Sequence, residues 1–286
     1  MPFAFIATHR GMWPAGWLCE ALGGSRAGVY AWRTRPPSVR TRTDAPVLIR
    51  GRASGLTSDR TDGARRVWHD MLVEGIACGR HRSERLMRHA ALRARPRRRR
   101  MPADTGGRST NAVAPNVLNR TFDAASANRK WGADFTYRWT AEGWRSVAAV
   151  MDLFSRRVVG WSMRATMTAQ LVTDALVMAI WRRGTPNPVR HHSDRGSQYT
   201  RAPFQRLLAD HGVTGSMSRA GNVWDNAVLE SFCSSLKTAR TAAKMYRARA
   251  QAQADVFDYI ECCYHPRRRH STRGYLSPME FEMMGE

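Results

Sequence analysis

Three acidic residues in the second half of the chain could act together chemically. Asp134 lies in an alternating stretch typical of a strand, Asp194 follows a short apolar run and precedes a Gly-Ser turn, and Glu230 lies in a predicted helix. A single acid in such a position is usually a solvated surface group. Three converging carboxylates repel one another, so they need a hard divalent cation, such as Mg²⁺ or Mn²⁺, to be ionised together.

The elements around these acids predict a mixed α/β sheet that can bring them together. The stretches "WGADFTYRW", "RSVAAVMDLF" and "RRVVGWSMR" favour antiparallel strands, and the apolar stripe of "TAQLVTDALVMAIWRR" favours a core-facing helix. A helical crossover returns the chain parallel to an earlier strand, so the next strand, "NPVRHHS", can lie beside the first. Asp134 and Asp194 would then be neighbours. The long helix "DNAVLESFCSSLKTAR", capped by Asp225 or Asn222, can carry Glu230 to them.

The charge of the chain points to a polyanionic partner. It has 46 Lys and Arg against 23 Asp and Glu, a net charge of +23, and nucleic acid is the commonest partner of such proteins. Residues 1–110 carry 22 Arg and 8 acids, and the rest of the chain carries 24 basic and 15 acidic residues. The sequence lacks the GxxxxGK[ST], GxSxG and GxGxxG motifs, which disfavours P-loop, serine hydrolase and dinucleotide-binding sites.

The first 100 residues predict a helical, arginine-rich region. Two helical pairs, at about 13–32 and 62–92, are candidate helix-turn-helix segments, although ordinary helical hairpins would look the same. Residues 34–46 and 101–128 have the polar composition of linkers. Ten arginines fall within residues 79–100, and a solvated face is the alternative to phosphate contact. The expected DNA contacts in this region are Arg80, Arg82, Arg85, Arg88, Arg97, Arg98, Arg99 and Arg100.

Other signals are weaker. Five cysteines without a CxxC pair, no signal segment and no long apolar run predict a soluble cytoplasmic protein with reduced thiols. His191 and His192 are expected in structural or DNA-contacting roles, because strand neighbours point to opposite faces. Asp152 is a second acid near Asp134 or an edge residue. The set Cys262, Cys263, His265 and His270 has poor spacing for zinc, and Trp131, Trp139, Trp144 and Trp161 are expected in the core.

Several long motifs, in order, resemble one family. "WGADFTYRWTAEGW", "MDLFSRRVVGWSM", "HHSDRGSQYT", "SMSRAGNVWDNAVLESFCSSLK" and "YHPRRRHSTRGYLSPMEF" are similar to the catalytic product, OrfB, of the insertion-sequence-three transposases. The 35 residues between Asp194 and Glu230 match the acidic-triad spacing of that family. The resemblance implies a ribonuclease H-like mixed five-stranded sheet with flanking helices, preceded by a small all-helical region. The expected boundaries are 1–100 for DNA binding, 101–128 for a linker and 129–286 for an integrase-type core with a basic C-terminal segment.

The resemblance also implies a function. Asp134, Asp194 and Glu230 would be both catalytic residues and ligands of two Mg²⁺ or Mn²⁺ ions, in cleavage and strand transfer at the ends of an insertion sequence. Double-stranded DNA, further copies of the chain assembled on DNA and an upstream OrfA product are the implied partners, with a nucleoid-associated location. Asn226 and Lys237 share the helical face of Glu230, so we expect DNA contacts there, a solvated lysine being the alternative. Arg267, Arg268 and Arg269 are further expected contacts.

Five positions depart from the usual family pattern: Asp62, Ser146, Cys233, His265 and Arg273. Ser146 in a core strand and Cys233 on the catalytic helix could leave cavities that cost a few kcal/mol. Two alternatives therefore stay open. The chain could be a decayed copy that only binds DNA, or a metal-dependent endonuclease without strand transfer.

Overall fold

The computed structural model describes residues 2–96, 114–184, 188–219, 222–241 and 244–285. Arg97, Arg98, Arg99 and Arg100 lie outside the described residues. The chain divides into two compact units, residues 1–50 and 51–286, and each is described by itself. Within the described part of the chain, no helix is long and apolar enough to cross a membrane.

The first unit contains three short helices, α1 (Pro2–His9), α2 (Ala15–Ala21) and α3 (Arg26–Thr34). They enclose a small core of Ile6, Cys19 and Val29. Ser25 caps α3 by accepting a hydrogen bond from the backbone N–H of Gly28 at 3.0 Å, as its position before the helix predicts. The helical pair expected near residues 13–32 is therefore present.

The fourth helix, α4 (Val39–Thr57), corrects one expectation. The segment 34–46 looked like a linker because of its prolines, but the structure is helical from Val39 onward and Pro46 lies inside the helix. A proline within a helix removes one hydrogen bond without abolishing the remaining ones. The break that the composition indicates is therefore real but shorter, because only residues 35–38 are non-helical.

Two further helices belong to the second unit, α5 (Ala64–Val73) and α6 (Arg80–His89). They bury Val67 and Met71 from α5, and Leu86 and Met87 from α6. The Trp68 indole N–H donates to the carbonyl of Cys78 at 2.8 Å and fixes the connection between the two helices. The amphipathic pattern of this region thus forms the predicted helical pair.

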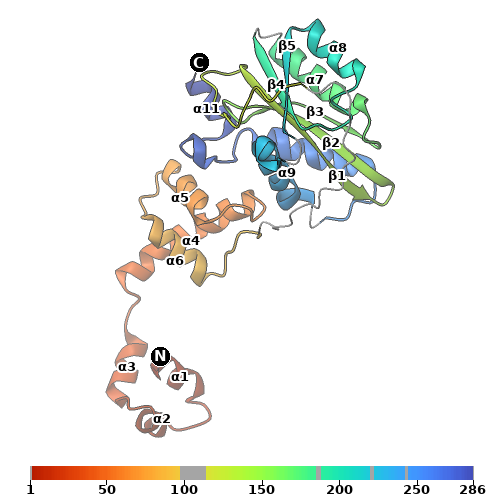
Figure 1. The fold of residues 1–286 in the computed structure, drawn as a ribbon. Coiled ribbons are helices and arrows are strands. Elements are labelled where there is room, and N and C mark those ends of the chain that lie inside the picture. Colours follow the sequence, from red (N-terminus) through yellow and green to blue (C-terminus); the bar gives the residue numbers. More distant parts are fainter. Residues whose placement is uncertain (1, 97–113, 185–187, 220–221, 242–243, 286) are drawn as a thin grey trace. The chain divides into compact units, whose positions relative to one another are not determined.

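The sheet of the second unit has five strands in the order β3-β2-β1-β4-β5 (Figure 1). β1 pairs antiparallel with β2 and parallel with β4. This arrangement confirms the predicted mixed sheet and the return of the fourth strand beside the first. The bounds are β1 (Lys130–Thr140), β2 (Gly143–Asp152), β3 (Val158–Arg164), β4 (Val189–Ser193) and β5 (Val213–Met217).

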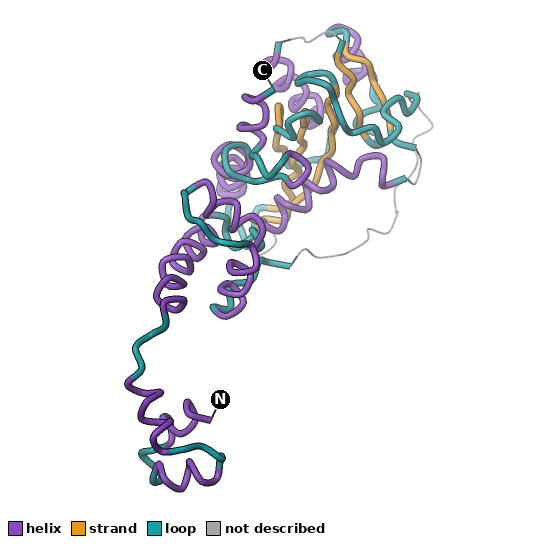
Figure 2. Tube along the Cα trace, turned by 90° about the vertical axis from the view of Figure 1, so that its left-hand side faces the viewer, coloured by secondary structure: helices purple, strands orange, loops and turns teal. Residues whose placement is uncertain are grey.

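Helices pack on the sheet through two separate apolar cores, and Figure 2 shows helices alongside the strands. The first core joins Trp131 and Ala133 of β1 to α7 (Ala169–Arg183) and α8 (Ala202–Asp210). The second joins β2 to α9 (Ala227–Leu236) and α10 (Arg249–Phe257). Gly132 lets α9 approach closely, because a Cβ atom there would lie 2.4 Å from a methyl carbon of Leu229. α9 therefore packs on β1 at Gly132, two residues before Asp134.

The helix that carries Glu230 begins differently from the prediction. A 3₁₀ helix, Val223–Asn226, precedes α9, and a π-helix, Lys237–Thr241, follows it. The side chain of Asn222 accepts from the Trp224 N–H at 3.2 Å and provides the cap. Asp225 does not cap the helix, because its carboxylate binds arginines instead. Asn222 thus caps the 3₁₀ helix, and α9 itself starts after Asn226 without a side-chain cap, so neither proposed residue caps α9 directly.

The C-terminal part packs against the sheet through a buried ion pair. It comprises a π-helix (Asp258–Tyr264), a 3₁₀ helix (Ser271–Arg273) and α11 (Pro278–Met284), which starts at a Ser277–Glu280 capping box. Glu282 of α11 is buried and pairs with Arg157, at 3.3 Å, and with Arg183. Because Arg157 precedes β3 and Arg183 ends α7, this acid joins three elements of the core.

Of the four tryptophans expected in the core, two are buried and two are exposed. Trp131 and Trp161 are buried as predicted, but Trp139 and Trp144 are 54% and 50% exposed. The reason is the length of the hairpin: β4 pairs with β1 from Lys130 to Gly132, so the distal half of the β1–β2 ribbon extends past β4, and near its tip Thr140 bridges Tyr246. The expectation that Trp139 and Trp144 are core residues is wrong.

Candidate active site

The sheet register places Asp134 and Asp194 beside each other. Gly132 of β1 pairs with His192 of β4, and each acid lies two positions further along its own strand direction. Backbone amides hold both carboxylates: Phe135 N–H donates to Asp134 at 2.8 Å, and Gly196 N–H donates to Asp194 at 3.0 Å. Asp134 within β1 and Asp194 just after the end of β4 are thus held next to each other.

Glu230 approaches the same edge from α9, on which it is exposed to solvent. Its charge and that of Asp194 both raise the pKa of Asp134, which reaches about 7 with burial as the largest cause. Burial also raises the pKa values of Asp194 and Glu230. The structure therefore brings the three predicted carboxylates close enough for Asp194 and Glu230 to act electrostatically on Asp134.

The donor set suits a hard cation, although its oxygens are not gathered around one point. The described residues contain no group of three or more His, Cys, Asp and Glu side chains placed as a ready metal site. A cation would relieve the repulsion that raises the pKa of Asp134, and carboxylate oxygens are the ligands that Mg²⁺ and Mn²⁺ prefer. Asp134, Asp194 and Glu230 thus fit such an ion chemically and would have to close around it.

Two residues beside the triad were not singled out as site residues. The thiol of Cys233 hydrogen-bonds Asp134, and burial together with that acid raises the thiol pKa. Tyr199 is fully buried, and the charges of Asp194 and Asp134 help to raise its pKa. Its position in "GSQYT", five residues after Asp194, was the available signal. Cys233, noted only as a departure that could leave a cavity, instead packs in the second core and contacts the triad.

Of the two helix neighbours expected to contact DNA, one is exposed. Lys237 is exposed, and its ammonium lies 5.6 Å from the ring centre of Tyr137. Asn226 is buried and donates to the carbonyl of Ala133 at 3.1 Å. Its amide therefore fixes the start of α9 to β1, which corrects the expectation that it faces DNA.

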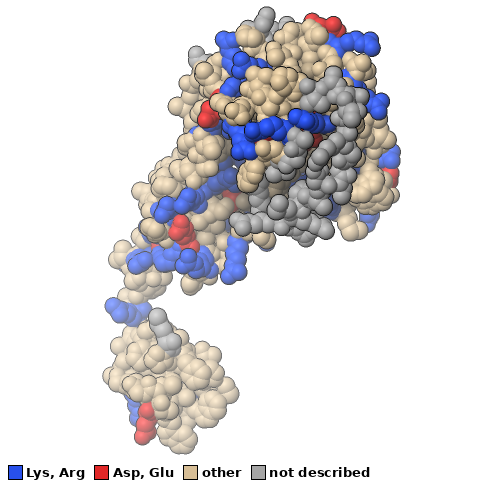
Figure 3. Space-filling view, viewed as in Figure 1, with Lys and Arg blue, Asp and Glu red and all other residues tan. Residues whose placement is uncertain are grey.

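The expected arginine contacts are divided in the same way. Arg88 and Arg267 are exposed, and Lys and Arg side chains are spread over the face seen in Figure 3. Arg268 donates to Ser235 at 3.1 Å, and Arg269 pairs with Asp70 at 2.5 Å. These last two side chains are nearly buried contacts between elements, so their expected role on an open DNA-binding surface is corrected.

Three arginines of α6 keep partial exposure. Arg80 lies 3.5 Å from Glu84, and the side chains of Arg82 and Arg85 are neither fully exposed nor buried. Contact with a phosphate by these residues remains a prediction.

A buried acid with arginine partners, Asp225, lies in the 3₁₀ helix that precedes α9. Asp225 is fully buried and receives hydrogen bonds from Arg219, at 2.8 and 2.9 Å, and from Arg120, at 3.1 Å. Asn116 donates to it as well, at 2.8 Å. The Arg219 guanidinium is the largest cause that holds the pKa of Asp225 far below its usual range. This network anchors residues 116–120 to the entrance of α9.

The remaining polar signals are structural. His192 is buried and bonded to Ser216 and Ser218, and His191 packs its ring against Phe204 at 5.4 Å. Asp152 is buried and accepts from the backbone N–H groups of Asn128, Phe154 and Ser155. Burial raises the pKa of this carboxyl. The set of Cys262, Cys263, His265 and His270 does not form a metal site among the described residues.

Three of the residues that depart from the family pattern make hydrogen bonds or ion pairs in the fold. His265 accepts from the Val158 N–H at 3.1 Å and contacts Glu261 at 3.2 Å. Arg273 donates to the carbonyls of Leu153 and Phe154, at 3.0 and 2.6 Å. Asp62 pairs with Arg66 at 3.0 Å, and nothing in the structure explains Ser146. The fold therefore accommodates most of these substitutions.

Comparison with known proteins assigns the chain to a family. Two models described as integrase core domain match residues 124–223 and 230–285, and an HTH-like domain model matches residues 52–100. Transposase InsF for insertion sequence IS3A, from Escherichia coli (strain K12), is 39% identical over 99% of this chain and 98% of its own length. The uncharacterized 31 kDa protein of insertion element IS600, from Shigella sonnei, is 36% identical over 92% of this chain and 97% of its own length.

Solved integrase structures also match. The catalytic core domain of HTLV-2 integrase in complex with magnesium aligns with a TM-score of 0.40 and 15% identity, over 55% of this chain and 97% of that one. A chain of the simian T-cell lymphotropic virus intasome in complex with PP2A regulatory subunit B56 gamma aligns with a TM-score of 0.46 and 13% identity, over 80% of this chain and 73% of that one. The near full-length match to InsF carries the assignment: the chain belongs to the IS3 family of insertion-sequence transposases.

Proposed function

We propose that this transposase cleaves DNA at the ends of an insertion sequence and joins the freed ends to target DNA. Asp134, Asp194 and Glu230 are its catalytic residues and hold two Mg²⁺ or Mn²⁺ ions. The observation that carries the proposal is the electrostatic coupling of these acids, which come from β1, the turn after β4 and α9. The buried structural acids Asp225 and Glu282 are paired with arginine, whereas Asp194 and Glu230 add to the raised pKa of Asp134.

The chain's own residues position the reaction. Phe135 N–H and Gly196 N–H fix the carboxylates of Asp134 and Asp194, and α9 presents Glu230 to solvent. The chemistry supplied by two bound ions is activation of an oxygen nucleophile and stabilisation of the leaving oxygen in an in-line displacement. Lys237 is exposed two helical turns beyond Glu230 and supplies a positive charge for a DNA phosphate.

DNA binding is assigned to the helical and basic parts. Residues 1–100 are proposed to bind the terminal repeats, residues 101–128 to link, and residues 129–286 to catalyse. Exposed Arg88 and Arg267 add phosphate contacts, and the net charge of +23 favours a polyanion throughout. Assembly of several copies on DNA and cooperation with an upstream OrfA product complete the proposal.

The test is a nicking and joining assay on the element's own terminal repeats with Mg²⁺ or Mn²⁺. Wild-type protein should yield joined products, and Glu230→Gln should yield none while still binding the DNA. Asp174→Asn, which removes a partly exposed acid on α7, is the matched control and should join normally. Nicking without joining would replace the proposal with an endonuclease, and joining by Glu230→Gln would contradict the triad.

A further inference from the structure

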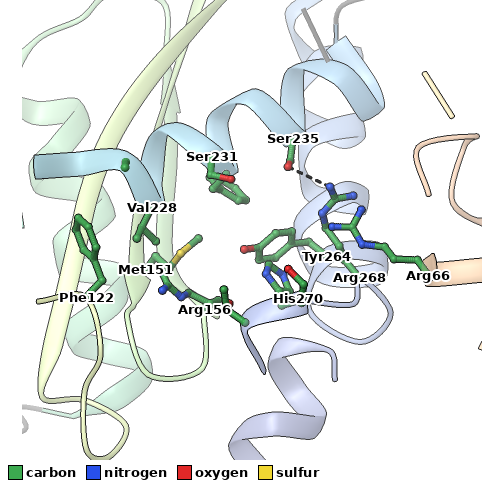
Figure 4. Close-up of a pocket in the computed structure, with 14 residues that line it drawn as sticks. Arg66, Phe122, Met151, Arg156, Val228, Ser231, Ser235, Tyr264, Arg268 and His270 are labelled. Carbon is green, nitrogen blue, oxygen red and sulfur yellow. Dashed lines mark hydrogen bonds between the residues drawn. The ribbon is translucent and has the colours of Figure 1, made fainter. Parts of the chain in front are cut away.

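A cavity of about 290 Å³ lies beside α9, away from the triad. Its lining comes from α5, the turn after β2, α9 and the C-terminal segment, and includes Arg66, Arg156, Ser231, Arg268, His270 and Thr272. Figure 4 shows Arg156 and Met151 on one side of it, Arg66 and Arg268 on the other, and Tyr264 and His270 between them. Segments far apart in the sequence thus contribute cations to one small space.

The positive charge in this cavity is incompletely balanced. Three arginines line it and no acidic residue is among its described lining residues. Asp62, from outside, lies 3.0 Å from Arg66 and 3.9 Å from Arg268. Arg156 has no ion pair among the described residues, and Arg273 lies near enough to help burial lower its pKa.

Several hydrogen-bonding groups here lack a partner. The Nε atom of Arg156 and the Nε2 atom of His270 are buried and make no hydrogen bond to the described residues. The hydroxyl groups of Ser231 and Thr272 belong to exposed residues on the rim. Burial and the charges of Arg268, Arg66 and Arg156 lower the pKa of His270 to about 3, so its ring is neutral at pH 7. Guanidinium, imidazole N–H and hydroxyl groups are all donors that suit a phosphate.

We propose that this cavity binds a phosphate group of the DNA backbone. The apolar walls, Phe122, Met151 and Val228, lower the local dielectric and strengthen the attraction of Arg156 for an anion. Ser231 on the rim follows Glu230 in α9 but points about 100° further round the helix, so a phosphate in the cavity would belong to DNA that continues past the triad on another face of α9. The inference rests on the proposed function only in taking DNA as the ligand, and it is independent of the cleavage chemistry.

The principal test is the salt dependence of DNA binding by the full chain without divalent metal. Arg156 has a φ of 67°, so Asn, which tolerates that conformation, is the suitable replacement. Arg156→Asn should weaken binding about tenfold and reduce the slope of log affinity against log salt by about 1. Arg156→Lys should keep the slope. Arg206→Gln, on α8 across the sheet, is the control and should stay close to wild type.

A second pair of variants keeps the test decisive if Arg156→Asn does not fold. Thr272 is exposed on the rim, so Thr272→Asp adds a negative charge there and Thr272→Asn is its neutral match. We expect the aspartate variant to lose affinity about tenfold and the asparagine variant to bind like wild type. Equal slopes for wild type, Arg156→Asn and Thr272→Asp, or equal losses in Arg156→Asn and Arg206→Gln, would overturn the proposal.

NMR of the His270 side chain separates a DNA phosphate from a free anion. A DNA duplex carrying the terminal repeat should shift the His270 resonances in metal-free buffer, and Arg156→Asn should abolish the shift. Inorganic phosphate that shifts them when DNA does not would overturn the proposal. Glu230→Gln should keep both the shift and the salt slope, so loss of joining in that variant would leave this inference standing.

Discussion

Two aspartates near the start of α9, Asp225 just before the helix and Asp134 on β1, have pKa values shifted in opposite directions. Asp225 is bound by Arg219 and Arg120, and its pKa lies far below the usual range, whereas the pKa of Asp134 is raised to about 7. Asn226 joins the two regions by its hydrogen bond to Ala133. The same residue type thus serves as an anchor where cations compensate it, and forms a candidate ligand where other acids surround it.

Arginines of the core show the same contrast between paired and unpaired charges. Arg183 and Arg157 are paired with buried Glu282 and fasten α11, whereas Arg156 has no ion pair among the described residues. The ion-paired charges mark structural joints, and Asp134 and Arg156 mark the two places where we propose that a metal ion and a phosphate bind. Substitutions at the ion-paired charges should therefore lower stability, and substitutions at Asp134, Asp194 or Glu230 should lower activity.

The largest effect expected is on activity. Asp194→Asn should reduce joining of element ends by more than a thousandfold, because the carboxylate beside Asp134 would lose the charge that holds a cation. Its melting temperature should stay at or above that of wild type, since one repulsive charge near Asp134 is removed. Joining within tenfold of wild type would show that Asp194 is not part of the active site.

The next effect is on stability. Asp225→Asn should lower the free energy of unfolding by roughly 3 kcal/mol, because it removes the negative charge and one of the two acceptor oxygens that Arg219 and Arg120 share. Half-exposed arginines can recover some hydration, so the loss should stay below that of a fully buried pair. Urea unfolding measures it, with Asp174→Asn as the control. An unchanged midpoint would refute the structural role of Asp225.

The pH dependence of the same residue follows from its lowered pKa. Asp225 binds fewer protons in the folded than in the unfolded chain, so its stabilising contribution is fully present above its ordinary pKa of about 4. That contribution is lost as the pH falls below about 4. Wild type should therefore lose more stability than Asp225→Asn between pH 5 and about 3. Parallel acid-unfolding curves for the two proteins would contradict the assignment.

The smallest effect concerns a departure from the family pattern. His265→Asn should lower the free energy of unfolding by about 1 kcal/mol. Asparagine is shorter than histidine and cannot reach both the Val158 N–H and the Glu261 carboxylate. The amide of asparagine can replace one of these hydrogen bonds. A gain in stability would indicate that His265 is a strained replacement, as expected of a decayed copy.

The sequence predicts the fold and the positions of the acids better than it predicts their surroundings. Alternation, short hairpins and one helical crossover are local signals, and together they place Asp134 beside Asp194. Whether Asp225 caps a helix or binds arginine depends on Arg219, which folds back from six residues away, and on Arg120, which is distant in the sequence. The exposure of Trp139 depends on how far β4 extends, which composition does not encode. The cationic cavity is likewise invisible, because Arg66, Arg156 and Arg268 meet only in the folded chain.

The most direct test of this account is calorimetric titration of Mn²⁺ into the full-length protein, with Asp134→Asn and Asp174→Asn as a matched pair. The uncompensated acids should bind Mn²⁺ in wild type and in Asp174→Asn, and Asp134→Asn should lose at least tenfold in affinity. Equal affinity in all three proteins would show that the ion binds elsewhere. It would contradict the assignment of Asp134, Asp194 and Glu230 as the metal-binding triad.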